Sequence, residues 1–218
     1  MARIDLLVVD DHPLLRAGVK VLLSSNSSIV ITEASSGDDA IFVLKQQRVD
    51  IVLLDIDMPG KNGVDVARYI EENFPDIKTV FLTSHADFYT FASATDVAYA
   101  GFLFKENALE LLSDCLATVA RGDKYIGKCC VEYFTANKER LDCVRKIKMA
   151  IKLLTDTELR VLLLVSEGKT TPQIAEQLFN SAKTIENHRT NICQKLELKG
   201  SNNLLTFALE NKWLFKND

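Results

Sequence analysis

The chain has 218 residues, of which 47% are hydrophobic and 26% are charged, with 9 glycines and 4 prolines. This composition suits one large or two ordinary globular domains and excludes collagen-like, disordered and low-complexity proteins. The 5 cysteines include no CxxC pair, and the apolar stretches are too short to cross a bilayer. We therefore expect a cytoplasmic protein with reduced thiols and no association with a membrane.

Charge is distributed unevenly along the chain, whose formal net charge is −4. Residues 1–121 hold 10 Lys and Arg against 18 Asp and Glu, whereas residues 122–218 hold 16 against 12. An acidic front and a mildly basic back indicate two modules with different partners. The positive excess of the second module is too small to indicate nucleic-acid binding without a motif.

The first module alternates short apolar runs with segments of helical periodicity. Strands are predicted over residues 4–9, 29–33, 51–54, 79–82 and 101–104. Helices are predicted over residues 14–23, 38–47, 64–73, 88–98 and 108–121. Because right-handed crossovers place such strands in parallel, we expect an α/β fold. Residues 1–121 should form a five-stranded, doubly wound, flavodoxin-like sheet that is covered on both faces.

Polar side chains stand where these strands end. Asp10 and Asp11 follow the first strand, Asp55 the third, Thr83 the fourth and Lys105 the fifth. The carboxyl ends of parallel strands meet at one edge of the sheet, where three carboxylates repel one another unless a hard divalent cation such as Mg²⁺ lies between them. A hydroxyl and an ammonium facing that cation would bind phosphoryl oxygens. The pattern predicts attack by an Asp on a phosphoryl donor, which gives an acyl phosphate.

The segment over residues 122–151 is predicted to be a partly helical linker, because its apolar periodicity is weak. From residue 152 to residue 218 every strong segment has helical periodicity, with helices predicted over 159–166, 171–178, 182–196 and 203–211. Thr155 precedes Glu158 by three residues, which is the spacing of a capping box. We expect a small all-α domain over residues 152–218.

The helix predicted over residues 182–196 has two different faces. Its apolar face carries Ile185, Ile192 and Leu196, and its opposite face is short, polar and rich in hydrogen-bonding groups, as reading a major groove requires. Candidate DNA contacts on this helix and at the start of the preceding one are Lys169, Thr171, Lys183, Thr184, Glu186, Asn187, His188, Arg189, Thr190, Gln194 and Lys195.

The first module resembles the receiver domain of response regulators in the segments VVDDHPLLRAG, LLDIDMPGKNGVDVARYI, FLTSHAD and AGFLFK. The resemblance implies that Asp55 is the phosphoacceptor. It also implies that Asp11 is the main carboxylate ligand of Mg²⁺, with Asp10 and Asp55 assisting and the backbone carbonyl of Asp57 completing the protein ligands. A sensor histidine kinase is the implied phosphoryl donor.

The same resemblance implies three residues that respond to the phosphoryl group. Thr83 would donate its hydroxyl to it, Lys105 would pair with it, and Phe102 would be the aromatic switch that turns inward on phosphorylation. Where the family commonly reads Gly-Ala-x-Gly, this chain has Ala98, Tyr99, Ala100 and Gly101. We therefore expect the end of the fourth helix to be placed differently.

The segment LTDTELRVLLLVSEGKTTPQIAEQLFNSAKTIENHRTNICQKLEL resembles the LuxR-type output domain of the NarL/FixJ family. The resemblance implies a response regulator that binds double-stranded DNA, as a homodimer when active, and is not a turnover enzyme. The last predicted helix, with Leu204, Leu205, Ala208 and the nearby Trp213, is either a pairing surface or part of the domain's own core.

Two other functions fit parts of the sequence. Glu186 stands where relatives often carry Lys, and this module has little net charge, so the alternative is that the output helices bind a protein under control of phosphorylation. Asp55 and Asp57 also weakly resemble the DxD motif of haloacid-dehalogenase-type phosphatases, but Met58 and Pro59 stand where that family usually has Thr or Val.

Overall fold

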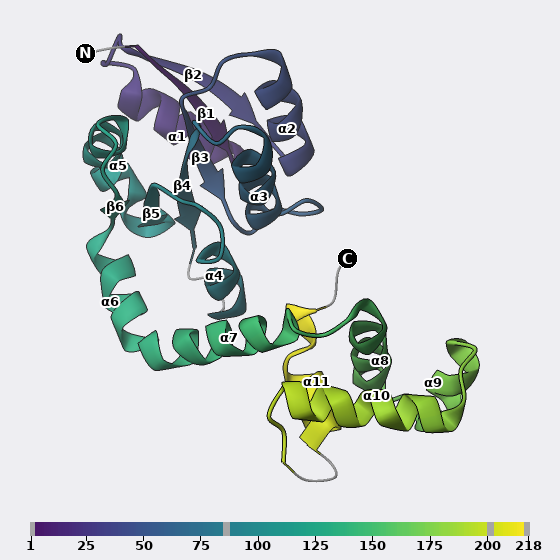
Figure 1. Ribbon diagram of the computed structural model, residues 1–218. Helices are drawn as coiled ribbons and strands as arrows, with labels where there is room; N and C mark the ends of the chain where they lie inside the picture. Colours follow the sequence, from purple (N-terminus) through teal and green to yellow (C-terminus); the bar gives the residue numbers. More distant parts are fainter. Residues whose placement is uncertain (1–2, 85–87, 200–202, 216–218) are drawn as a thin grey trace. The chain divides into compact units, whose positions relative to one another are not determined.

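The computed structural model describes residues 3–84, 88–199 and 203–215. The chain divides into two compact units, residues 1–137 and residues 138–218, and each is described by itself (Figure 1). Among the described residues, no helix has the length and apolar character that spanning a membrane requires.

The first unit is built on a parallel sheet with the strand order β2-β1-β3-β4-β5-β6. Its strands are β1 (Ile4–Val9), β2 (Ile29–Ala34), β3 (Ile51–Asp55), β4 (Lys78–Thr83), β5 (Gly101–Phe104) and β6 (Tyr125–Ile126). The predicted doubly wound α/β class is confirmed. The sixth strand was not predicted, because it has only two residues and no periodicity to reveal it.

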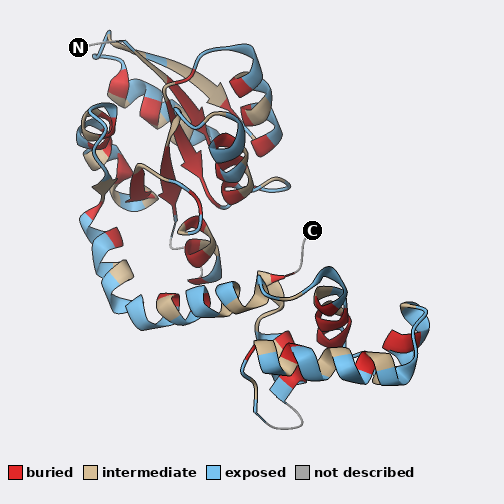
Figure 2. Ribbon diagram, in the orientation of Figure 1, coloured by how far each residue is buried: buried red, intermediate tan, exposed pale blue. Residues whose placement is uncertain are grey.

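Five helices cover the two faces of this sheet, with α1 and α5 on one face and α2 and α3 side by side on the other (Figure 1). They are α1 (Pro13–Leu23), α2 (Gly37–Gln46), α3 (Gly63–Asn73), α4 (Phe88–Ala94) and α5 (Lys105–Ala120). Burial from both sides explains why every residue of β3 is buried (Figure 2). Helix α4 ends four residues before the predicted position, and Tyr99 beyond it packs against Phe81 and Phe102.

The segment predicted as a linker is divided between the two units. Gly122 turns the chain with a φ of 97°, after which β6 pairs with β5 and α6 (Lys128–Ala136) follows. Both elements belong to the first unit, whereas α7 (Lys138–Ile151) belongs to the second. The first half of the segment is therefore an extension of the sheet domain.

The described residues of the second unit form helices joined by loops, with no strand among them. After α7 it contains α8 (Asp156–Ser166), α9 (Thr171–Gln177), α10 (Ala182–Lys195), α11 (Asn203–Glu210) and a 3₁₀ turn (Lys212–Leu214). The predicted capping box is present, since the Thr155 side chain accepts from the Glu158 amide and the Glu158 carboxylate accepts from the Thr155 amide. On α11, Leu204 and Ala208 are buried in the core, while Leu205 and Leu209 are exposed. The prediction that this helix is part of the domain's own core is therefore confirmed for Leu204 and Ala208, but not for Leu205.

Gly63 offers a test of how tightly the loop after β3 is packed. A Cβ on Gly63 would overlap the backbone carbonyl oxygen of Asp55, whereas a Cβ on Gly18 would meet only Leu109, at 3.7 Å. We expect Gly63→Ala to destabilise the first unit by at least ~2 kcal/mol and Gly18→Ala to be neutral or stabilising by up to ~1 kcal/mol.

The measurement is urea unfolding of the full chain by circular dichroism. The fluorescence of Trp213, the only tryptophan in the sequence, identifies the transition of the second unit. Equal free energies of unfolding for the two variants would contradict the predicted overlap at Gly63.

Candidate functional site

A cluster of carboxylates lies at the carboxyl ends of the central strands. Val9 pairs with Leu54 in the register of β1 and β3, so the residues that follow, Asp10 and Asp55, are neighbours. Both side chains are fully buried, while that of Asp11 remains 30% exposed. One carboxylate oxygen from each of these three residues and one ring nitrogen of His12 all lie within 4.8 Å of one another.

Lys105 places its ammonium between the two buried carboxylates. Its Nζ lies 2.8 Å from Oδ2 of Asp10 and 2.8 Å from Oδ2 of Asp55. Burial raises the pKa of Asp55, and the charge of Asp10 raises it further, while Lys105 opposes the shift. Burial lowers the pKa of Lys105, but the two carboxylates outweigh this and its pKa is raised. The ammonium is therefore held in its charged form.

The cluster fits a divalent cation. Three carboxylates face the single positive charge of Lys105, so negative charge remains in excess at a site whose donors are those that Mg²⁺ prefers. Asp11, the most exposed of the three, leaves the cluster open to solvent. Asp57 is held beside the site, because its amide donates to Oδ1 of Asp55 at 3.3 Å.

His12 belongs to the same cluster, although the sequence did not single it out. Its amide donates to Oδ1 of Asp10 at 2.8 Å, and its Nδ1 lies 2.8 Å from Oδ1 of Asp11. Its position directly after the two acids was the signal that could have found it. The imidazole therefore helps to orient the acid pair.

Thr83 and Phe102 lie where the sequence placed them, at the end of β4 and within β5. Thr83 is buried, and its hydroxyl donates to the carbonyl of Ser84 at 2.6 Å. Phe102 is fully buried, with its ring centroid 5.0 Å from that of Phe91. The Phe102 ring, which the resemblance implies would turn inward on phosphorylation, already points into the protein interior in this structure.

In the second unit, α10 has the two faces that the sequence predicted. Ile185 and Ile192 are buried in the core. The opposite face is exposed at Lys183, Glu186, Asn187, Thr190 and Gln194. Lys183 Nζ and Glu186 Oε2 form an ion pair at 3.4 Å. The surface that could enter a groove therefore carries partly compensated charge.

The other candidate DNA contacts differ in their exposure and in their hydrogen bonds within the second unit. Lys169 is exposed and Thr171 half-buried at the start of α9, and Arg189 is half-buried on α10. Thr184 is bound to the capping residue Ser181, with 2.8 Å between their hydroxyl oxygens. Nδ1 of His188 is buried and, within the described part of the chain, accepts or donates no hydrogen bond.

Lys195 is already engaged within the second unit. Its Nζ lies 2.6 Å from Oε2 of Glu158, the carboxylate that also caps α8. Burial alone would raise the pKa of Glu158, but Lys195 and the hydrogen bonds from Thr155 outweigh it and lower this pKa. A phosphate contact by Lys195 stays a prediction, and it would have to compete with this ion pair.

Comparison with known families identifies both units. Residues 6–117 match the family described as "Response regulator receiver domain", and residues 152–208 match "Bacterial regulatory proteins, luxR family". The chain is 31% identical over 207 residues to the response regulator UvrY of Escherichia coli K12, with 94% of each chain covered. It is 32% identical over 215 residues to the oxygen regulatory protein NreC of Staphylococcus epidermidis, covering 96% of this chain and 98% of NreC.

Solved structures agree with this assignment. RcsB of Salmonella enterica serovar Typhimurium, bound to the promoter P1flhDC in the presence of the phosphomimetic BeF₃⁻, matches with a TM-score of 0.57 and 25% identity. That match covers 94% of this chain and 97% of RcsB. The chain is therefore a two-component response regulator with a receiver domain and a LuxR-type output domain. It belongs to the NarL/FixJ family, and this membership replaces the phosphatase alternative.

The carboxylate cluster predicts stabilisation by Mg²⁺. A ligand that binds only the folded state at 100 times its Kd adds ~2.7 kcal/mol, which raises the Tm of the first unit by several degrees. Asp11→Ala should abolish most of this increase. Asp38→Ala, which removes a carboxylate that is 81% exposed and lies outside the cluster, should retain it. Calorimetry with and without MgCl₂ at matched ionic strength checks this, and an equal response of both variants would contradict it.

The ion pair between Glu158 and Lys195 predicts a pH-dependent stability of the second unit. Because the pKa of Glu158 is lowered in the folded state, its contribution is present above the unfolded pKa of about 4.3 and is lost as the pH falls through the folded pKa. Glu158→Gln keeps an acceptor for the Thr155 amide but loses the charge.

We expect this variant to be ~1–2 kcal/mol less stable at pH 7 and to approach the wild type as the pH falls through the lowered folded pKa of Glu158. Thermal unfolding of both chains at pH 7 and at acidic pH, monitored by Trp213 fluorescence, measures the difference in stability at each pH. A difference between the two chains that does not depend on pH would contradict the ionic role of Glu158.

Proposed function

We propose that this response regulator receives a phosphoryl group on Asp55 from a sensor histidine kinase and controls transcription by binding double-stranded DNA through α10. The observation that carries the proposal is the burial of Asp55 against Asp10 and Lys105, in a cluster that is open to solvent beside Asp11. The protein acts in the cytoplasm, where its 5 cysteines, all free of disulfides, remain reduced.

The chemistry is a single phosphoryl transfer. A carboxylate oxygen of Asp55 attacks the phosphorus of a phosphohistidine, the P–N bond breaks, and the acyl phosphate forms as the imidazole leaves. When bound by Asp10, Asp11, Asp55 and the backbone carbonyl of Asp57, Mg²⁺ neutralises charge on the transferring oxygens.

The protein's own groups then adjust to the acyl phosphate. Lys105 keeps its ammonium beside Asp55 and pairs with a phosphoryl oxygen. Thr83 turns its hydroxyl from Ser84 towards the same group. The receiver assists this transfer and the later hydrolysis of its own acyl phosphate, but it turns over no separate substrate.

DNA recognition uses the exposed face of α10. Asn187 and Gln194 present amides that pair with adenine edges, and Glu186 can accept from a cytosine amine. Phosphate contacts come from Lys183 and Arg189. Further phosphate and groove contacts come from the residues around them, which are Lys169, Thr171, Thr184, His188 and Thr190. RcsB, which is 25% identical to this chain, has been solved in complexes with DNA, and this similarity supports this part of the proposal.

Dimerisation strengthens DNA binding by a module with so little net charge. Residues 150–218 hold 9 Lys and Arg against 8 Asp and Glu, so electrostatic attraction to phosphates is weak. In a dimer, binding of one recognition helix to its half-site raises the effective concentration of the second helix at the other half-site. This compensates for the weak attraction of each output domain alone. The exposed Leu205 and Leu209 on α11 offer an apolar surface for pairing two output domains.

The testing experiment selects fragments from a random double-stranded DNA library with the purified chain. One selection contains Mg²⁺ alone, one contains Mg²⁺ and beryllofluoride, and a third uses Asp55→Asn with both. We expect a shared motif that is enriched by at least about tenfold only when wild-type chain and beryllofluoride are combined. Equal enrichment in all three would remove Asp55 as the control. Enrichment in none would favour the alternative in which the output helices bind a protein.

Two substitutions on α10 should separate base reading from phosphate contact. Asn187→Ala should cost ~1–3 kcal/mol on the selected motif and relax its sequence at one position. Arg189→Ala should weaken binding to all sequences alike and reduce the salt slope by about 1. Fluorescence anisotropy at several salt concentrations measures both, and interchanged phenotypes would contradict the assignment.

A further inference from the structure

Helix α6 is seated on the receiver through an aromatic cluster, defined here as Phe91, Phe102, Phe104, Tyr133 and Phe134. The Phe91 ring centroid on α4 lies 4.5 Å from that of Tyr133 and 4.6 Å from that of Phe134. On β5, Phe102 lies 5.7 Å from Phe134, and Phe104 lies 6.0 Å from Tyr133. The two α6 rings therefore cover the face formed by α4 and β5.

The start of α6 is attached to the same strand by its backbone. The amide of Gly127 donates to the carbonyl of Phe102 at 2.9 Å, and a Cβ on Gly127 would come within 3.2 Å of Leu103. One turn later Cys130 is fully buried, in contact with the backbone of Phe104, whereas Cys129 beside it is exposed. Cys130 therefore reports whether α6 is docked.

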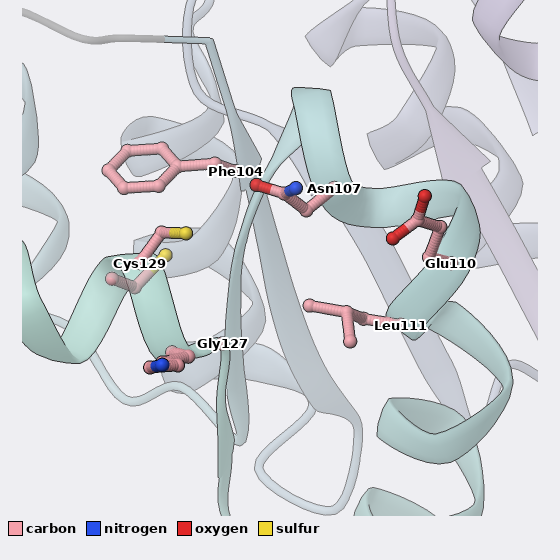
Figure 3. A pocket seen from close by; sticks show the side chains of 8 residues that line it. Phe104, Asn107, Glu110, Leu111, Gly127 and Cys129 are labelled. Atoms are coloured by element: carbon pink, nitrogen blue, oxygen red, sulfur yellow. The ribbon is translucent and has the colours of Figure 1, made fainter.

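The packing is less complete on the side of α6 that faces α5. A cavity of about 160 Å³ opens there between β5, α5 and the first turn of α6, with Phe104, Leu111 and Cys129 among its walls (Figure 3). The cavity leaves this side of α6 incompletely packed, so the aromatic cluster, the Gly127 hydrogen bond and the buried Cys130 hold the helix in position. The core cluster around Cys115 includes none of the residues of the aromatic cluster, so release of α6 need not open that core.

Phe102 is surrounded by four other aromatic rings. Its ring is fully buried among those of Phe81, Tyr99, Phe91 and Phe134. The ring cannot swing away from the sheet while Phe134 covers it. The inward position of Phe102 and the docked position of α6 are therefore mutually dependent.

We propose that the phosphorylation state of Asp55 is passed to the output domain by the docking of α6, which an inward Phe102 permits and an outward Phe102 prevents. The inference rests on the proposed function. Phe81 and Thr83 lie on one face of β4 and pair in register with Phe102 and Phe104. Drawing the Thr83 hydroxyl towards a phosphoryl group leaves space on that face for the two rings. Phosphorylation thus holds α6 on the receiver, directly before the second unit begins at Lys138.

The test measures how fast Cys130 reacts with a thiol reagent in the full chain. Cys129→Ser removes the exposed neighbour, and mass spectrometry of peptides then follows Cys130 and Cys115 separately. Burial raises the pKa of both thiols to about 12, and Cys115 lies in the core behind the sheet. Opening of the whole receiver would expose both thiols, whereas release of α6 would expose Cys130 alone.

With Mg²⁺ and beryllofluoride, we expect Cys130 to react about tenfold more slowly, with Cys115 unchanged and no effect in Asp55→Asn. Fluorine NMR of bound beryllofluoride shows separately whether Asp55 is occupied. Bound beryllofluoride with an unchanged or faster reaction of Cys130 overturns the inference but leaves the proposed function standing. Absence of bound beryllofluoride overturns both.

A pair of variants tests the aromatic cluster without any phosphoryl mimic. Phe134→Ala should speed the reaction of Cys130 about tenfold, and Phe134→Leu should do so less, while Cys115 stays protected in both. Val131→Ala, on the same helix but with a side chain that is 47% exposed, should change neither rate. Equal rates for all three variants would show that these rings do not hold α6.

Discussion

The receiver depends on the burial of two carboxylates around one ammonium. Asp10 and Asp55 are fully buried, and Lys105 lies 2.8 Å from each. Buried charges of one sign are costly unless they are paired, so the ends of three strands must meet closely enough for Lys105 to reach both carboxylates. The same arrangement leaves Asp55 partly uncompensated, and this residual negative charge is what a divalent cation can use. Folding and reactivity therefore have a common electrostatic origin.

The aromatic cluster extends this dependence away from the carboxylates. Strand β5 carries Phe102 and Phe104 on one face and is followed directly by Lys105, so one short element connects the charged site to the helix that covers α4. Rings packed this closely have few alternative arrangements, which favours two discrete positions of α6 over a gradual shift.

Much of this was predictable from the sequence, because the strongest signals are local. Asp55 could be placed at a strand end from the apolar run before it, and the polar face of α10 followed from helical periodicity. Strand β6 could not be predicted, since Tyr125 and Ile126 gain their strand character only by pairing with β5. The ion pair of Lys195 with Glu158 escaped for a similar reason, because 37 residues separate the two side chains in the chain. Both features are contacts between distant segments, which composition and spacing do not record.

If α10 reads DNA as proposed, the ion pair of Lys183 with Glu186 on its exposed face would affect how the protein searches DNA. A lysine that already has a carboxylate beside it releases fewer counterions when it meets a phosphate, so contacts with arbitrary sequence are short-lived. At a site where a cytosine amine engages Glu186, the lysine is freed for the backbone and both groups gain a partner. Such an ion pair shortens the residence time at non-specific DNA more than at the specific site. Discrimination between the two kinds of site therefore increases, while the affinity for both decreases.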